Sequence, residues 1–246
     1  RAVGEGTNKP IDLDEFDLYY DHLVLWDREH DRFVGAYRIG NGQRIMERYG
    51  KRGFYTSTLF RMDRAMDRVL RQSYELGRSF VVAEYQKHRL PLYLLWRGLL
   101  LLLLRNTGHR YLIGPVSISS NYSPFSRALI MDFVRQHHYD HELAAHVHPR
   151  NRFHIKPGKA DSADLLEAAG DLRTLDKLIA DIEPKENAVP VLLKKYLMLN
   201  SKIIGFNSDP RFNDSLDGLI LMDLTTVPPK TIEDLKRGMT EEAGEA

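Results

Sequence analysis

The chain has 246 residues, enough to bury a substantial core as one large domain or two small ones. Its 35 basic and 34 acidic side chains give a net charge of +1 and are scattered, so no basic stripe indicates a nucleic-acid partner. It contains no cysteine, which excludes disulfides, thiolate metal ligands and a cysteine nucleophile, and is compatible with a reducing compartment.

The N-terminal part of the chain predicts an antiparallel hairpin. Residues 1–20 are polar, turn acidic, and are expected to form a loop and a short helix that lead into a sheet. Residues 22–27 and 33–39 are apolar and flank a polar turn, which is typical of two antiparallel strands. A helix over 63–71 and a strand near Glu75 are expected next.

The middle of the chain predicts a parallel pair of strands. The apolar stretch 90–104, with Arg97 in its middle, is about fifteen residues long, short of the roughly twenty that span a bilayer, and indicates a buried helix. A strand over 111–119 follows, and then a helix from Pro124 to about His137 that begins with a Ser123 cap. Strand, helix, strand and helix in this order imply parallel strands joined by a crossover.

The rest of the chain is expected to leave the sheet and return to it. Residues 140–187 are rich in charge and are interpreted as a helical insertion. The further expected elements are helices over 162–169, 172–182 and 191–199, and strands over 203–206 and 219–224 joined by a loop over 207–218.

The segment Glu75-Leu76-Gly77-Arg78-Ser79-Phe80-Val81 carries the best indication of chemistry. On a regular strand Glu75 and Arg78 would face opposite sides of the sheet. A β-bulge at Gly77 would bend the strand, bring both charged side chains to one face and leave a backbone N–H unpaired beside them. An acid, a base and an amide donor together would suit acyl transfer, whereas an ordinary ion pair at a strand start is the alternative.

This segment resembles the Glu-x-x-Arg-Phe stretch of acyl-homoserine lactone synthases, and more closely the Glu-Leu-Gly-Arg-Ser-Phe of ornithine and glycine lipid N-acyltransferases. Asp17 and Asp21 resemble the acidic pair upstream in both families, and Arg38 the arginine on the following strand. The segments 95–99, 111–119 and 204–207 also resemble the lipid-forming group.

The resemblance, which covers about residues 1–225, implies the GNAT fold: an α/β (α+β) protein with a mixed, mostly antiparallel central sheet and flanking helices. It implies one GNAT-like domain over 1–246, truncated at its N-terminus, with 140–187 inserted in it. Some members of the lipid-forming group, which carry haemolysin-type labels, have a second acyltransferase domain upstream, so an upstream domain is expected here too.

The implied activity is transfer of a long, 3-hydroxylated acyl chain from acyl carrier protein to the α-amine of an amino acid of the ornithine or glycine type. The product would be a lyso amino-acid lipid, made in the cytoplasm with peripheral contact to the inner face of the membrane. No permanently bound cofactor, metal or nucleic acid is expected. The co-substrate would be acyl carrier protein or acyl-CoA, and residues 88–92 favour the carrier because they replace the glycine-rich pyrophosphate loop of acetyl-CoA-using relatives. Two alternatives are a lactone-synthase-like enzyme that uses S-adenosylmethionine and a non-catalytic module that binds acyl carrier or lipid.

Amide formation from a thioester needs a neutral amine, a hydrogen-bond donor to the oxyanion, a proton for the thiolate and residues that bind both substrates. The resemblance implies that Glu75 accepts the ammonium proton, directly or through water. Arg78 and Arg38 would steady Glu75 and Asp21, or grip an amino-acid carboxylate. Asp17 is the other candidate for the acidic role.

Four further residues complete the expected site. Backbone N–H groups around Phe80 and Val81 would polarise the thioester carbonyl. Tyr122 would protonate the thiolate. Arg97 would reach the phosphate of the carrier's phosphopantetheine arm, or would extend out of a core helix into solvent.

Overall fold

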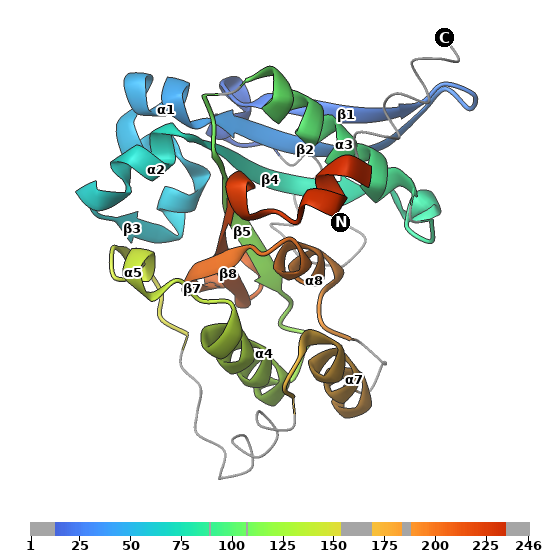
Figure 1. Cartoon of the computed structure of the whole chain (residues 1–246), viewed down its shortest axis with the longest axis vertical. Coiled ribbons are helices and arrows are strands. Elements are labelled where there is room, and N and C mark those ends of the chain that lie inside the picture. Colours follow the sequence, from blue (N-terminus) through green and yellow to red (C-terminus); the bar gives the residue numbers. More distant parts are fainter. Residues whose placement is uncertain (1–12, 89, 107, 154–168, 184–187, 235–246) are drawn as a thin grey trace. The chain divides into compact units, whose positions relative to one another are not determined.

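The computed structural model describes residues 13–88, 90–106, 108–153, 169–183 and 188–234. The chain divides into two compact units. Unit 1 comprises residues 1–55, 67–114 and 223–246, and unit 2 comprises residues 56–66 and 115–222. Figure 1 labels the helices and strands of both units. A single domain over 1–246 stays a prediction. The described part of 140–187 lies in unit 2 and contains a short strand as well as helices.

Unit 1 is built on an antiparallel sheet that gains a parallel neighbour. Its strands are β1 (Asp21–Asp27), β2 (Arg32–Asn41) and β4 (Ser73–Val81), and its helices are α1 (Gly42–Arg48), α2 (Asp67–Arg71) and α3 (Leu90–Arg105). β2 pairs with both β1 and β4 in antiparallel fashion. The start of β5 (Tyr111–Ile118) then pairs with β4 in parallel, from Ser73↔Tyr111 to Glu75↔Ile113. The predicted hairpin and parallel pair are confirmed.

Helix α3 is the crossover between β4 and β5, as its apolar sequence predicted. It packs against β1 and β2. Gly98 allows this close approach, since a Cβ atom there would lie 2.9 Å from the side chain of Leu23. No helix in the described part of the chain is both long and apolar enough to cross a membrane.

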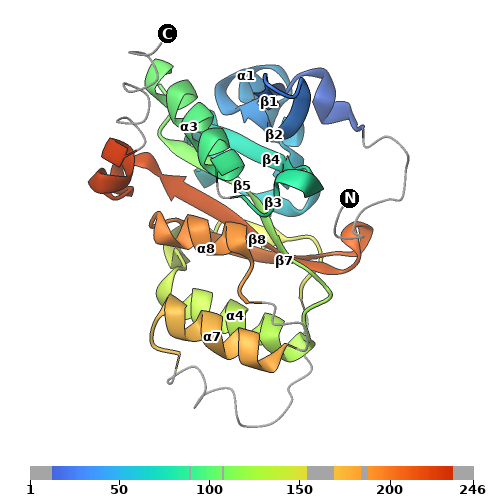
Figure 2. The same ribbon diagram turned by 90° about the vertical axis from the view of Figure 1, so that its right-hand side faces the viewer.

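Unit 2 contains the end of β5, which is followed in the sheet by β8 (Ser215–Asp223) and then β7 (Lys202–Asp209). A separate antiparallel pair is formed by β3 (Phe60–Met62) and β6 (Val147–Pro149). Its helices are α4 (Pro124–His137), α5 (His141–Ala144), α7 (Leu172–Ile182) and α8 (Val191–Met198). α4 and α7 pack side by side (Figure 2). The predicted cap of α4 is confirmed, because Ser123 Oγ accepts a hydrogen bond from the Ser126 N–H at 3.1 Å.

The mixed, mostly antiparallel sheet with flanking helices is therefore confirmed, but some local predictions were wrong. The expected loop 207–218 is largely strand, because Asn207 and Asp217 are buried and hydrogen-bonded rather than solvated. Only the second half of the expected helix 63–71 is α-helical, and β3 and β6 were not predicted. Residues 162–168 of the expected helix 162–169 lie outside the described residues.

Candidate active site

Strand β4 departs from regular pairing at one point. Ala36 of β2 lies opposite Phe80, whereas Arg38 lies opposite Gly77, so a step of two residues on β2 matches a step of three on β4. This mismatch is a β-bulge with its extra residue between Gly77 and Phe80. Arg78 takes the left-handed backbone conformation there, with φ of 45°, while φ at Gly77 is not positive. The predicted bulge is confirmed, but the strained residue is Arg78 and not the glycine.

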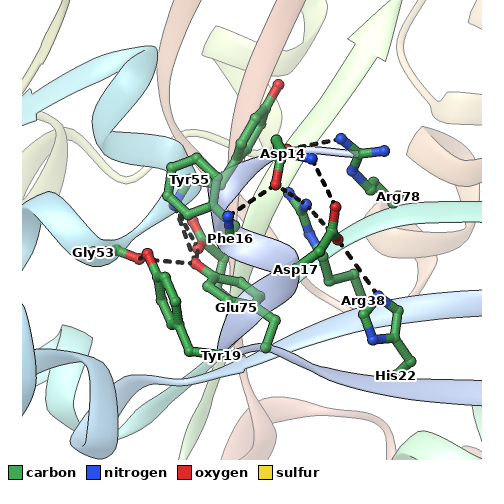
Figure 3. A network of polar contacts seen from close by, with 11 residues as sticks. Asp14, Phe16, Asp17, Tyr19, His22, Arg38, Gly53, Tyr55, Glu75 and Arg78 are labelled. Carbon is green, nitrogen blue, oxygen red and sulfur yellow. Dashed lines mark hydrogen bonds and ion pairs between the residues drawn. The ribbon is translucent and has the colours of Figure 1, made fainter. Parts of the chain in front are cut away.

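The register places the expected acid and one arginine on the same face of the sheet. Glu75 lies opposite Gly40 and Gly77 lies opposite Arg38, so Glu75 and Arg38 point to one side. After the bulge Arg78 joins the same cluster of polar contacts (Figure 3). All the residues of this cluster belong to unit 1.

Asp14 is the centre of the charged part of the cluster. Its Oδ1 accepts a hydrogen bond from Arg38 Nη1 at 2.6 Å, and its Oδ2 accepts one from Arg78 Nη2 at 2.7 Å. Asp17 Oδ1 binds the same Nη1 of Arg38 at 3.0 Å. Asp14 and Asp17 also form a reciprocal capping box around the short 3₁₀ helix Glu15–Leu18. One carboxylate thus joins the two arginines, and a second supports Arg38.

Arg38 is held in a buried aromatic cage. Its side chain is 1% exposed, and its guanidinium carbon lies 5.6, 5.2 and 5.4 Å from the ring centroids of Phe16, Tyr20 and Tyr55. Its Nε has no hydrogen-bond partner in the described part of the chain. A buried cation of this kind is stable only because two carboxylates and three rings compensate the loss of hydration.

Glu75 is equally buried and is hydrogen-bonded to two residues of this cage. Its side chain accepts a hydrogen bond from the Tyr55 backbone N–H at 2.9 Å and another from the Tyr20 hydroxyl. The Tyr55 N–H is also 3.1 Å from Tyr20 Oη, and Tyr20 Oη is 3.3 Å from Gly53 O. Glu75 is therefore linked to Arg38 through two aromatic residues that contact both.

The electrostatics of the cluster keep Asp14 and Asp17 charged and the Tyr20 phenol neutral. Burial would raise the pKa of Asp14, but the hydrogen bonds and charges of Arg38 and Arg78 outweigh burial and lower it. The pKa of Asp17 is lowered in the same way: the Asp14 N–H and Arg38 outweigh its burial. Burial, followed by the charge of Glu75, raises the pKa of Tyr20, which therefore remains a hydrogen-bond donor.

Asp21 does not belong to this cluster. Asp21 is on β1 and lies opposite Ile39 of β2, whereas its neighbour His22 lies opposite Arg38. Because side chains alternate along a strand, Asp21 points to the face of the sheet opposite to Arg38. There its exposed carboxylate pairs with Arg44. The expectation that Arg38 steadies Asp21 was wrong, and Asp14 with Asp17 takes that place.

Phe80 and Val81 were expected to supply unpaired N–H groups, but both are back in register with β2, opposite Ala36 and Gly35. The irregular part of β4 is the bulge that precedes them. Phe80 instead presents a half-exposed ring.

Arg97 lies in α3 and is buried, with its guanidinium carbon 5.9 Å from the centroid of the Tyr93 ring. It does not extend into solvent as one interpretation expected. Whether it meets a carrier phosphate stays a prediction.

Tyr122 lies in unit 2, and its hydroxyl donates a hydrogen bond to the carbonyl oxygen of Ala188 at 2.5 Å. Burial, with the charges of Glu183 and Asp176, raises the pKa of Tyr122 to about 12. Tyr122 and Glu75 belong to different units, so the role of Tyr122 as an acid stays a prediction.

Sequence reasoning missed Asp14, Tyr20 and Tyr55. The spacing Asp14-x-x-Asp17 is a recognisable capping-box pattern and could have indicated that these two aspartates act together. No local pattern identified the tyrosines, because they reach Glu75 across long separations in sequence.

The cluster contains no group of three side chains suited to a metal ion, and none occurs elsewhere in the described residues. What it offers is a buried carboxylate joined to a phenol, and a pair of arginines joined by an aspartate. Such groups can accept a proton and orient a carboxylate-bearing substrate.

Known proteins are similar to the chain, including the region that contains the cluster. Residues 1–96, which include every member of the cluster, match the acetyltransferase (GNAT) domain. The chain is 29% identical over 226 residues to a glycine N(alpha)-acyltransferase of Phocaeicola vulgatus, covering 87% of this chain and 62% of that protein. It is 34% identical over 154 residues to a glycine N(alpha)-acyltransferase of Bacteroides thetaiotaomicron, covering 58% of this chain and 45% of that protein.

Two solved structures also align with the chain. One is a CoA-dependent acyl-homoserine lactone synthase (TM-score 0.40, 14% identity, 95% of this chain and 76% of that chain). The other is an aminoglycoside 6'-N-acetyltransferase complexed with coenzyme A (TM-score 0.39, 12% identity, 84% of this chain and 73% of that chain). The chain thus matches the GNAT domain over residues 1–96, is similar to glycine N(alpha)-acyltransferases over most of its length, and spans less than two thirds of their length.

Proposed function

We propose that the chain is an N-acyltransferase that moves an acyl group from a thioester to the α-amine of glycine or a similar amino acid. The observation that carries this proposal is the bulged Glu75–Arg78 segment, with its buried acid and paired arginines, inside the region that matches the GNAT domain. Similarity to two glycine N(alpha)-acyltransferases supports glycine as the acceptor.

In the proposed reaction the amine nitrogen attacks the thioester carbonyl carbon, the C–N bond forms and the C–S bond breaks. The nitrogen loses a proton, and the departing sulfur gains one. Glu75 is 1% exposed, so we place Tyr20 between it and the amine. Tyr20 Oη would take the amine proton while passing its own proton to Glu75.

Arg78 is better placed than Arg38 to hold the acceptor's carboxylate. The side chain of Arg78 is 26% exposed, whereas that of Arg38 is 1% exposed and enclosed by rings. Arg38 would instead hold Asp14 and Asp17, and Asp14 in turn would position Arg78. The extra residue of a bulge is left out of the ladder, so we place the oxyanion donor at Ser79 rather than at Phe80 or Val81.

The donor and the product extend the proposal further. We keep acyl carrier protein as the favoured donor over CoA, a long 3-hydroxylated acyl chain, and a lyso amino-acid lipid as product. An upstream acyltransferase domain and peripheral membrane contact belong to the same proposal. They are supported by the sequence resemblance alone.

The test is an assay of the purified chain with acyl-CoA and, separately, acyl carrier protein, against glycine, ornithine, serine and S-adenosylmethionine. Mass spectrometry should detect an N-acyl amino acid, most abundantly from glycine. Glu75→Gln should reduce the rate of N-acyl amino acid formation at least tenfold, whereas Glu29→Gln, in the exposed β1–β2 turn, should leave this rate unchanged. An acyl-homoserine lactone would indicate a lactone synthase. Acyl-carrier binding with no product from any acceptor would indicate a binding module and refute the proposal.

A further inference from the structure

A basic pocket lies in unit 2, outside the cluster described above. It has a volume of about 360 Å³ and is lined by Arg61, His148, Pro149, Arg150 and Arg152. All of these residues belong to unit 2, so the pocket is formed within one unit. The volume is within the range of roughly 300 to 1,000 Å³ that is usual for small-molecule sites.

The strand pair β3–β6 places the first two basic side chains next to each other. Arg61 lies directly opposite His148, between the pairs Phe60↔Pro149 and Met62↔Val147. Phe60, Met62 and Val147 are buried, so alternation turns Arg61 and His148 away from the core. Directly opposed residues of an antiparallel pair have Cβ atoms only about 5 Å apart.

The other two arginines are supplied by a segment that backbone contacts anchor. The Arg150 N–H donates to Leu59 O at 2.9 Å, and Arg150 Nε donates to Ser57 O at 2.8 Å, which orients its guanidinium group. Asn151 is held from both sides, since its N–H donates to Asn207 Oδ1 and its carbonyl accepts from Ser208, both at 2.9 Å. Arg152 therefore leaves a fixed stretch of backbone.

The pocket has little local compensation for its positive charge. No carboxylate lines it, and Arg61 and Arg152 make no ion pair in the described part of the chain. Asp63, which does not line the pocket, lies 3.1 Å from His148 and 3.8 Å from His146, and the charge of Arg61 helps to lower its pKa. Concave clusters of uncompensated arginines attract anions, and planar guanidinium groups match the oxygen atoms of a phosphate.

We propose that this pocket binds a phosphate group of a ligand through Arg61, Arg150 and Arg152. The phosphate belongs either to a small soluble molecule or to a lipid headgroup, and the chemistry of recognition is the same for both. This inference does not depend on the proposed acyltransferase activity, because it concerns binding in unit 2.

The test uses the full chain and isothermal titration with inorganic pyrophosphate, together with sedimentation of phosphatidylglycerol vesicles. Arg61→Gln with Arg152→Gln should weaken binding of the recognised phosphate at least tenfold and reduce its dependence on salt. Arg211→Gln, an exposed arginine of the same unit, is the matched control and should leave binding unchanged. Circular dichroism of each variant shows whether the fold is retained.

Either source of phosphate supports the proposal. Saturable binding of pyrophosphate that the double variant abolishes indicates a soluble ligand, and vesicle binding that the double variant abolishes indicates a headgroup. The proposal would be overturned by no saturable binding of either probe at low salt, or by equal binding of the wild type and the double variant. Binding of an acyl carrier protein without its prosthetic arm, insensitive to pyrophosphate, would also overturn it, since the surface would then recognise acidic side chains.

Discussion

Replacement of Arg38 by methionine tests the cage directly. Arg38 makes hydrogen bonds to Asp14 and Asp17 and contacts three aromatic rings, with 1% of its side chain exposed. Breaking a buried ion pair by removing one partner costs about 3 to 5 kcal/mol. Asp14 keeps Arg78 as a partner and is 26% exposed, so we expect the low end of this range, about 3 kcal/mol.

The measurement is urea unfolding followed by tryptophan fluorescence. Both tryptophans, Trp26 and Trp96, belong to unit 1, so their fluorescence reports on the unit that contains the cage. Arg44→Met is the matched control, because the Arg44–Asp21 pair is exposed on both sides and such pairs contribute less than about 1 kcal/mol. A loss below about 1 kcal/mol for Arg38→Met, or equal losses in both variants, would refute the reasoning.

The same variant has an expected pH signature. The pKa values of Asp14 and Asp17 lie below their ordinary value of 3.8 in the folded protein, so the unfolded chain binds more protons in acid. Their stabilising contribution is present above the ordinary pKa and is lost as the pH falls through the lowered folded pKa. Without Arg38 this contribution is smaller, so the difference in unfolding free energy between wild type and Arg38→Met should shrink below about pH 4.

Five further substitutions test the remaining assignments. Tyr20→Phe removes the hydroxyl that we propose carries the amine proton to Glu75, so kcat for N-acylation should fall at least tenfold with KM for the amino acid little changed. Arg78→Val should destabilise unit 1 by about 1 to 2 kcal/mol more than Arg78→Gly in urea unfolding, because only glycine accepts a positive φ without strain. Gly77→Ala should change the free energy of unfolding by less than about 0.5 kcal/mol, because a Cβ atom at this position would meet nothing within 4 Å. Tyr122→Phe should cost about 1 kcal/mol in thermal unfolding for one lost buried hydrogen bond, and should lower kcat as well if this tyrosine protonates the thiolate.

Each of these expectations has a result that contradicts it. Wild-type kcat in Tyr20→Phe would exclude the tyrosine from the proton path. Equal stability of Arg78→Val and Arg78→Gly would show that the bulge carries no strain at that residue. An unchanged kcat in Tyr122→Phe would limit this residue to its structural hydrogen bond.

Short-range patterns determined much of the fold in advance. The hairpin, the crossover helix and the cap of α4 depend on alternation, apolar length and a Ser-Pro pair, all of which act within a few residues of chain. The segment from Glu75 to Arg78 likewise indicated a bulge, because a charged pair around a glycine is hard to place on a regular strand.

The sequence did not predict which residue of the bulge has a positive φ, or that much of 207–218 is strand. A glycine suggested where the bulge would lie, yet the adjacent arginine takes the positive φ. Polar composition suggested a loop over 207–218, yet buried hydrogen bonds to Asn207 and Asp217 let β7 and β8 continue through much of it. In both cases a tertiary contact outweighs the local preference of the residue type.

The sequence by itself determined which residue types were available for the candidate site and near which strand they would gather. Only the tertiary structure decided the partners: Asp14 rather than Asp21 for Arg38, and Tyr20 with Tyr55 for Glu75. The physical reason is that spacing along a strand specifies which face a side chain occupies, whereas contacts between residues far apart in sequence depend on how the elements pack.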